Sequence, residues 1–178
     1  MRNACSMVLI SSLFLASCSG NKSAAESGGS NVPAQMDSQQ TIESMSVTET
    51  KGGRANWTLE ASKARVLESD KRIFLDEPRV KFFSQGKYAS TLRASSGTVS
   101  TENYDIWAQG DCYLETVKGE KLFAKNLRYR SDIQKIVTDD PIRLERDKQV
   151  ITGLGMEATP DLEKIVIKKQ RVVVVDNE

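Results

Sequence analysis

The stretch LFAKNLRYRSDIQKIVTDDPIRLERDKQVITGLGME (residues 122–157) decides the fold, because it holds the two patterns that organise the rest of the chain. Apolar and polar residues alternate along it, as in strands with one buried face. The turn-forming pairs Ser131-Asp132 and Asp147-Lys148 separate the alternating runs, and helical periodicity is scarcely visible. The stretch therefore predicts long antiparallel strands joined by tight turns.

The same stretch is the second copy of an internal sequence repeat. An earlier stretch, TLEASKARVLESDKRIFLDEPRV (residues 58–80), matches it at one constant offset. Internal similarity of this kind is typical of stacked or rolled β architectures, in which one unit cannot bury its apolar face alone. We interpret the repeat as a pair of hairpins used twice. The matched pairs are Leu59 and Leu122, Ala61 and Ala124, Arg65 and Arg128, Ile73 and Ile136, and Pro78 and Pro141.

Turn signals extend this pattern over the whole of residues 41–178. They recur at intervals of about 15 residues, which leaves runs longer than ordinary strands. The chain is thus expected to be all-β, with about nine strands in antiparallel meanders. The turn pairs are Gly52-Gly53, Ser69-Asp70, Gln85-Gly86, Glu102-Asn103, Lys118-Gly119, Ser131-Asp132, Asp147-Lys148 and Pro160-Asp161.

Within six of these runs the alternation slips by one residue. A slip would turn every later side chain to the opposite face unless a bulge or bend restored the inward direction. We therefore predict bent strands in two facing sheets, as an elongated open sandwich or β-jellyroll. The slips separate Leu59 and Ala61 from Ala64 and Val66, Ile73 and Leu75 from Val80 and Phe82, Leu92 and Ala94 from Gly97 and Val99, Leu122 and Ala124 from Leu127 and Tyr129, Ile151 and Gly153 from Met156 and Ala158, and Ile165 and Ile167 from Val172 and Val174.

The apolar interior of this sandwich is the first candidate for function. Sheets of such long bent strands need not close at both edges, and an open apolar seam would suit an acyl chain. A closed core is the equally supported alternative. The residues predicted to line the interior are Trp57, Leu59, Ile73, Leu75, Phe82, Leu92, Ile106, Leu122, Tyr129, Ile136, Leu144 and Ile151.

The terminal strands are the second candidate. The segments TIESMSVTET (residues 41–50) and KIVIKKQRVVVVDNE (residues 164–178) should form sheet edges. Residues 172–175 are all valine, and so β-prone an edge invites pairing with another chain, so we expect a partner strand there. Closure into a barrel, a frayed tail, or protection of the edge by Lys168, Lys169 and Arg171 are the alternatives.

The composition argues against an enzyme. The chain has no His, which excludes Ser-His-Asp and Cys-His sites and most zinc sites. Four acids precede the two matched prolines, but no glycine-spaced calcium loop accompanies them, so we interpret them as solvated turn-flanking charge. We predict no catalytic residue, no metal and no cofactor, and a net charge of +1 offers no field for nucleic acid. The four acids are Asp76, Glu77, Asp139 and Asp140.

The amino terminus has the features of a secretory signal. Arg2 precedes a mostly apolar run that ends in Leu15-Ala16-Ser17-Cys18, which resembles a bacterial lipobox. We predict a lipoprotein signal peptide over residues 1–18, with Cys18 lipidated, and a flexible tether over residues 19–40. Cys112 is then the remaining cysteine of the folded domain, and its setting favours a small buried hydrophobe over a reactive thiol.

Several stretches together resemble the LptC family of the lipopolysaccharide export machinery: TIESMSVTETKGGRANWTLEASKARV, IFLDEPRVKFF, LRASSGTV, LFAKNLRYRSDIQKIVTDDPIRL and ITGLGMEAT. The resemblance covers residues 41–175. It implies an OstA-like β-roll and a non-enzymatic periplasmic relay. Such a relay accepts lipopolysaccharide from the inner-membrane transporter LptBFG, holds its lipid A acyl chains in the apolar groove, and passes it to LptA.

The resemblance also assigns roles to the edges. Ile42, Met45 and Val47 would face the transporter, and the carboxyl-terminal edge, formed by Ile165, Ile167, Val172 and Val174, would face LptA. Gly153 and Gly155 match a structural glycine pair of the family, at which backbone freedom in a strand suits a bend. The edges would also permit a homo-oligomer.

One departure from the family is the anchor. Typical members keep an uncleaved transmembrane helix, whereas Cys18 predicts a lipid anchor. The inner membrane is the expected location, but Ser19 leaves the outer membrane open. The competing interpretations are a bridge subunit like LptA, against which an anchor argues, and a β-rich lipoprotein that acts as an envelope scaffold without transferring lipid.

Overall fold

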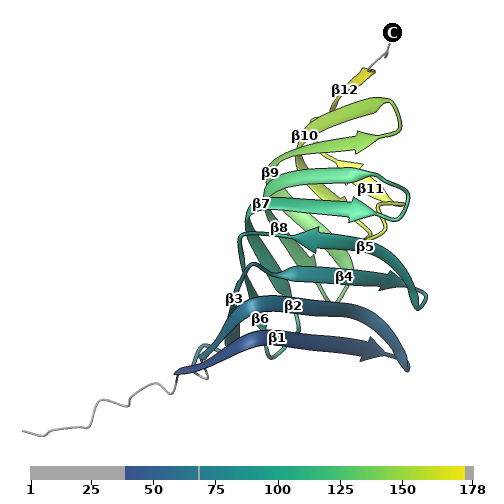
Figure 1. Ribbon diagram of the computed structural model, residues 1–178. Helices are drawn as coiled ribbons and strands as arrows, with labels where there is room; N and C mark the ends of the chain where they lie inside the picture. The colour runs from purple at the N-terminus through teal and green to yellow at the C-terminus, as the bar shows by residue number, and fades with distance from the viewer. Residues whose placement is uncertain (1–38, 68, 175–178) are drawn as a thin grey trace, which may run out of the picture. The chain divides into compact units, whose positions relative to one another are not determined.

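The computed structural model describes residues 39–67 and 69–174 as an antiparallel β unit (Figure 1). The predicted signal peptide, Cys18 and nearly all of the predicted tether lie outside these residues. Within them, no helix is long and apolar enough to cross a membrane. The strands are β1 (Gln39–Lys51), β2 (Arg54–Leu67), β3 (Arg72–Asp76), β4 (Arg79–Ser84), β5 (Lys87–Arg93), β6 (Ser96–Ser100), β7 (Ile106–Thr116), β8 (Lys121–Arg130), β9 (Lys135–Arg146), β10 (Gln149–Ala158), β11 (Ile165–Ile167) and β12 (Arg171–Val174).

The all-β fold is confirmed, although the prediction of about nine strands counted runs of chain and not separate strands. Three runs are broken at their bends, so that β3 and β4, β5 and β6, and β11 and β12 each form one run. The breaks have local causes. At the first two, the Glu77 amide donates to Ser95 O at 3.1 Å and the Ala94 amide donates to Pro78 O at 3.2 Å, which replaces regular strand pairing. All eight predicted turn pairs fall between runs.

The long strands bend from one layer into a second. β2 pairs with β4 through residues 57–60 and with β3 through residues 63–67. β7 likewise pairs with β5 through residues 113–116 and with β6 through residues 106–109. We call the layer that contains β4, β5 and β12 layer A, and the layer that contains β3, β6 and β11 layer B. In Figure 1, layer A is in front and layer B runs behind it.

Bulges mark the bends, as the slips in alternation predict. The register shifts between Gln109 and Cys112 in β7, between Ala124 and Arg128 in β8, and between Leu154 and Met156 in β10. The bend of β7 was not among those predicted; it falls at Gly110 and Asp111, both of which have positive φ. Each bulge keeps apolar side chains pointing between the layers on both of its sides.

The internal sequence repeat is also visible in the structure. In its first copy Val66 is opposite Ile73, and in its second copy the corresponding Tyr129 is opposite Ile136. The two hairpins therefore have the same register beside their turns, which supports the interpretation of a unit used twice.

The sheet does not close into a barrel. Among the described strands, β1 pairs with β2 alone, and β11 and β12 pair with β10 alone. These strands form opposite ends of the sheet, as Figure 1 shows. The terminal segments are therefore edges, and the alternative of barrel closure is wrong.

Candidate functional site

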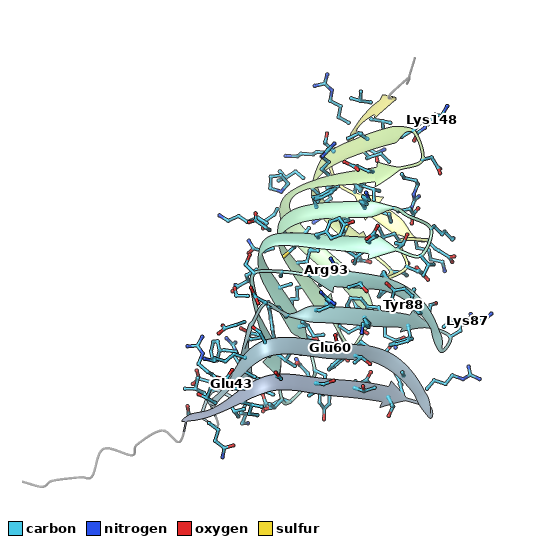
Figure 2. All side chains as sticks on the ribbon, viewed as in Figure 1. Glu43, Glu60, Lys87, Tyr88, Arg93 and Lys148 are labelled. Atoms are coloured by element: carbon cyan, nitrogen blue, oxygen red, sulfur yellow. The ribbon has the colours of Figure 1, made fainter. Side chains whose placement is uncertain are left out.

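The space between the two layers is filled by apolar side chains. Ten of the twelve predicted interior residues are fully buried, and the other two, Ile73 and Ile151, are half-buried against the same cluster. The outer surfaces carry polar side chains instead, among them Glu43, Lys87 and Arg93 (Figure 2). The ten are Trp57, Leu59, Leu75, Phe82, Leu92, Ile106, Leu122, Tyr129, Ile136 and Leu144.

Aromatic rings form one part of this interior. The Phe82 and Tyr129 ring centroids lie 5.0 Å apart in a tilted arrangement, which brings β4 of layer A against β8 of layer B. The Tyr129 hydroxyl accepts a hydrogen bond from Asn56 Nδ2 at 3.0 Å. Burial raises the pKa of the Tyr129 phenol, although the Asn56 hydrogen bond acts in the opposite direction. Tyr129 therefore stays neutral near pH 7 and presents an apolar body with a satisfied polar tip.

On the side opposite the bends, the layers meet along a seam between strand ends. Asn56, at the start of β2, bridges it, because it contacts Tyr129 and also accepts a hydrogen bond from Gln134 Nε2 at 3.2 Å. A hollow of about 330 Å³ opens beside this bridge. Phe83, Ile133 and Pro160 supply apolar walls to the hollow, so the seam is partly apolar at its mouth.

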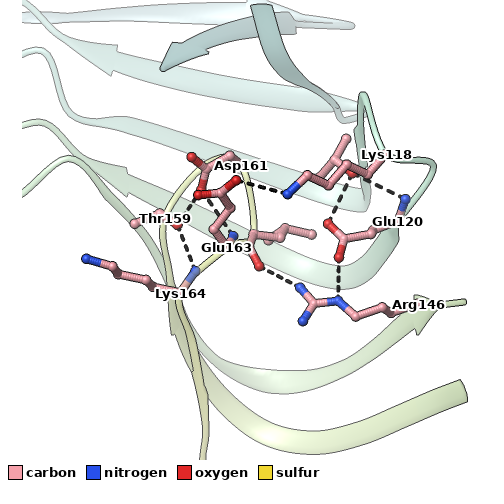
Figure 3. Close-up of polar contacts among 9 residues, drawn as sticks. Lys118, Glu120, Arg146, Thr159, Asp161, Glu163 and Lys164 are labelled. Atoms are coloured by element: carbon pink, nitrogen blue, oxygen red, sulfur yellow. Dashed lines mark hydrogen bonds and ion pairs between the residues drawn. The ribbon is translucent and has the colours of Figure 1, made fainter. Parts of the chain in front are cut away.

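Farther along, the seam is covered by the loop of residues 159–164, which we call the seam loop. It follows β10 at the end of layer B and contacts strand ends of layer A (Figure 3). Ser90 Oγ donates to Pro160 O at 2.6 Å, and Arg146 Nη2 donates to Leu162 O at 2.5 Å. The sequence predicted only a turn here. Leu162, the one leucine among the polar residues of this loop, was the available signal for a buried contact.

Two buried acidic groups were also missed, and both have structural partners. Asp105 accepts hydrogen bonds from Arg128 Nη2 at 2.6 Å and from the Ser131 amide at 2.9 Å. Glu120 forms an ion pair with Arg146 Nε. Since each carboxylate already has a cation and a hydrogen-bond donor, neither resembles an acid poised for catalysis.

The predicted turn-flanking acids lie at the bends and do not converge on one site. Asp139 forms an exposed ion pair with Lys168 at 3.4 Å, and Asp140 accepts a hydrogen bond from Asn126 at 2.7 Å. Asp76 lies 3.8 Å from Arg65, and Glu77 is exposed. In the described part of the chain, no group of His, Cys, Asp and Glu residues is arranged to hold a metal ion.

The predicted edge residues are on the outermost strands. Ile42 and Val47 of β1 are exposed, whereas Met45 packs partly against the core. On the other edge, Ile165 and Ile167 pack partly against the core. Val172 is exposed, and the side chain of Val174 lies outside the described part.

The two predicted structural glycines lie in β10, next to the carboxyl-terminal edge. Gly155 has φ +77° at the bend, a conformation that L side chains rarely adopt. Gly153 has no such φ, but a Cβ there would lie 2.2 Å from Ile167 Cγ2. Gly155 therefore serves the bend, and Gly153 allows the close approach of the end of β11 and of the chain that follows it.

The comparisons with known proteins agree with this geometry. A family model described as "Lipopolysaccharide-assembly, LptC-related" matches residues 7–174. A search of curated proteins finds no match. Among solved structures, the fold is similar to that of LptH from Pseudomonas aeruginosa, described as the LptA-homologous periplasmic component of a lipopolysaccharide transport device. That match has a TM-score of 0.53 and 12% identity, and covers 67% of this chain and 95% of LptH. The chain thus has an LptA-like β-jellyroll and belongs to the LptC-related family of lipopolysaccharide-assembly proteins.

Proposed function

We propose that the chain is a periplasmic relay for lipopolysaccharide, which holds the lipid A acyl chains between the two layers while the sugars stay outside. The observation that carries the proposal is a single apolar interior that extends through a sheet with an open edge at each end. An acyl chain that lies in such a space is removed from water, because the side chains around it are apolar.

The edges fit transfer between neighbouring proteins. β1 would receive lipopolysaccharide from the LptBFG transporter through Ile42, Met45 and Val47. β11 and β12 would pair with LptA through Ile165, Ile167, Val172 and Val174. The unpaired outer sides of these strands support this arrangement, because they offer main-chain hydrogen bonds to a partner strand.

We further propose that a lipid on Cys18 anchors the domain at the periplasmic face of a membrane, with the inner membrane expected from the family. Replacing Cys18 with Ala should abolish labelling of the protein by radioactive palmitate. Separation of the inner and outer membranes then locates the labelled protein. Unchanged labelling of the Ala variant would disprove the anchor at Cys18.

The relay is tested by photocrosslinking in cells. An azidophenylalanine at Phe82 keeps the buried aromatic ring and adds an azide to it, and the same probe at exposed Lys148 is the matched control. We expect lipopolysaccharide adducts at Phe82 and not at Lys148. A second interior probe at Leu92 guards against a local effect of the first.

An envelope scaffold is the second candidate, and one observation favours it: the interior is tightly filled, with Leu122 and Ile136 at 0% exposure. Under this alternative the apolar cluster is an ordinary core and the edges serve assembly alone. An absence of adducts at both interior positions, in cells that make lipopolysaccharide, would favour the scaffold over the relay.

A further inference from the structure

The seam loop is built as one unit that spans the two layers. Within it, the Leu162 amide donates to Thr159 O at 2.9 Å, and the Lys164 amide donates to Thr159 Oγ1 at 3.2 Å. Asp161 accepts hydrogen bonds from Thr159 Oγ1 at 2.5 Å and from the Glu163 amide at 3.1 Å. Burial disfavours ionisation of Asp161, but these bonds and one from Ser84 outweigh it and lower its pKa. The loop therefore has a defined shape of its own.

Leu162 makes this loop part of the interior. Its side chain is 0% exposed and belongs to the apolar cluster, and among the described residues it is the one cluster member that lies outside a strand. Leu162 also has φ +56°, a conformation that non-glycine residues avoid unless their surroundings impose it. A buried apolar side chain is thus held against the core by a strained backbone.

Polar groups of layer A hold Leu162 in place. Arg146 donates to the Leu162 carbonyl and pairs with Glu120, whose other oxygen accepts a hydrogen bond from Thr116 Oγ1 at 3.2 Å. At the surface, Lys118 donates to Glu163 at 2.9 Å. Figure 3 shows the contacts of Arg146 and Lys118 converging on the loop from one side. The strand ends that carry these groups can stay folded when the loop moves away, because water can replace the hydrogen bonds that the side chains lose.

We propose that the seam loop is a lateral gate, through which an acyl chain enters the interior by displacing Leu162. This inference rests on the proposed function, since it supplies the entry route for the lipid A chains. The apolar walls of Phe83, Ile133 and Pro160 lie at the mouth beside the loop. One apolar group then replaces another in the core, while Arg146 and its partner Glu120 hold the loop closed in the empty protein.

Locking the loop tests the gate. The variant Lys118→Cys/Glu163→Cys is linked by a short bis-methanethiosulfonate, and the same variant treated with methyl methanethiosulfonate is its unlinked form. The matched control is Lys71→Cys/Glu102→Cys, because Lys71 and Glu102 are also an exposed ion pair but join two turns of layer B. Both are made in the full chain with azidophenylalanine at Phe82, and purified lipid A is the probe.

We expect the link across the seam to lower the yield of lipid A adducts at least tenfold relative to the unlinked form, with no difference between the linked and unlinked forms of the control. Equal yields from the linked and unlinked forms of the seam variant would overturn the gate alone. An absence of adducts in every form would overturn the proposed function and the gate with it.

Loosening the loop should have the opposite effect. The double variant Glu120→Gln/Arg146→Gln removes both charges together, so that neither is left buried without its partner. We expect lipid A adducts to form several-fold faster, and hydrogen exchange to increase in residues 159–164 while the core of β8 stays protected. Faster exchange in the loop with an unchanged adduct rate would show that the loop does not control entry.

Discussion

Gly153 shows how strongly a single position can depend on its neighbours. Ile167 Cγ2 and the carbonyl oxygen of Lys168 lie 2.2 Å and 3.1 Å from where a Cβ would stand. Sequence alone indicated that a glycine pair matters here, but it assigned the reason to backbone freedom. For Gly153 the reason is space, which depends on a chain segment that returns after the seam loop.

We predict that Gly153→Ala lowers the free energy of unfolding by about 1–3 kcal/mol, because Ile167 must move away from β10. Gly153→Arg should do more damage and detach β11. Urea unfolding measures the first effect, and Gln149→Ala, at an exposed position of the same strand, is the control that should change little. Equal midpoints for Gly153→Ala and the parent would contradict this explanation.

Matched residues in the two copies of the repeat do not all make equivalent contacts. Arg65 and Arg128 occupy matched positions, yet Arg65 makes a long surface contact to Asp76 at 3.8 Å, whereas Arg128 binds buried Asp105 at 2.6 Å. Arg128 also lies 4.9 Å from the centre of the Trp107 ring. The apolar members of the repeat could be predicted to share a role, because burial follows the strand period. The charged members could not, because their partners come from different kinds of element: Asp76 ends β3, whereas Asp105 lies in the loop between β6 and β7.

At the scale of elements, the predicted turns and bends follow from local chemistry, and the seam loop does not. The pair Pro160-Asp161 correctly marks a reversal of the chain. What makes the reversal a cover for the interior is its contact with Ser90 and Arg146, which lie on β5 and β9. Contacts between strand ends of opposite layers have no signature in a single run of sequence.

The carboxyl-terminal edge provides a prediction at this scale. Val166 is 66% exposed and Val173 is 48% exposed, on two strands whose outer sides are unpaired. Lysines there should weaken association of this edge with another strand, because a charge in a newly formed ladder would be buried. We expect Val166→Lys/Val173→Lys to weaken the proposed self-association and the proposed LptA binding about tenfold without changing stability.

Analytical ultracentrifugation and pull-down with LptA measure these two effects. Val117→Lys is the matched control, because Val117 is 60% exposed but lies in the turn between β7 and β8. If the control variant lost as much binding as the double variant, general surface charge would explain the result and the edge would not.

At the scale of the whole β unit, the sequence predicted the two facing layers and most of the interior, because alternation and its slips specify which face of each run is inward. It could not decide between a closed core and an open groove. That difference depends on what lies across the seam, where Leu162 and the bridge from Asn56 to Tyr129 complete the closure.

Cys112 offers a way to measure whether the layers separate. It is buried in β7, one of the strands that contribute to both layers, and burial raises the pKa of its thiol to about 11. At pH 8 only about one thiol in a thousand would then be ionised, and the thiolate is the form that reacts with iodoacetamide. In the closed protein, alkylation of Cys112 should be at least about a hundredfold slower than in urea.

Lipid A should change this rate if acyl chains part the layers, because each opening that admits a chain also exposes Cys112 to water and to iodoacetamide. We expect faster alkylation of the peptide that contains Cys112 when lipid A is added, measured by mass spectrometry at pH 8. Val117→Cys, on an exposed turn, should react rapidly with or without lipid. An unchanged rate at Cys112, in protein that forms lipid A adducts at Phe82, would mean that lipid enters at the seam without separating the layers around β7.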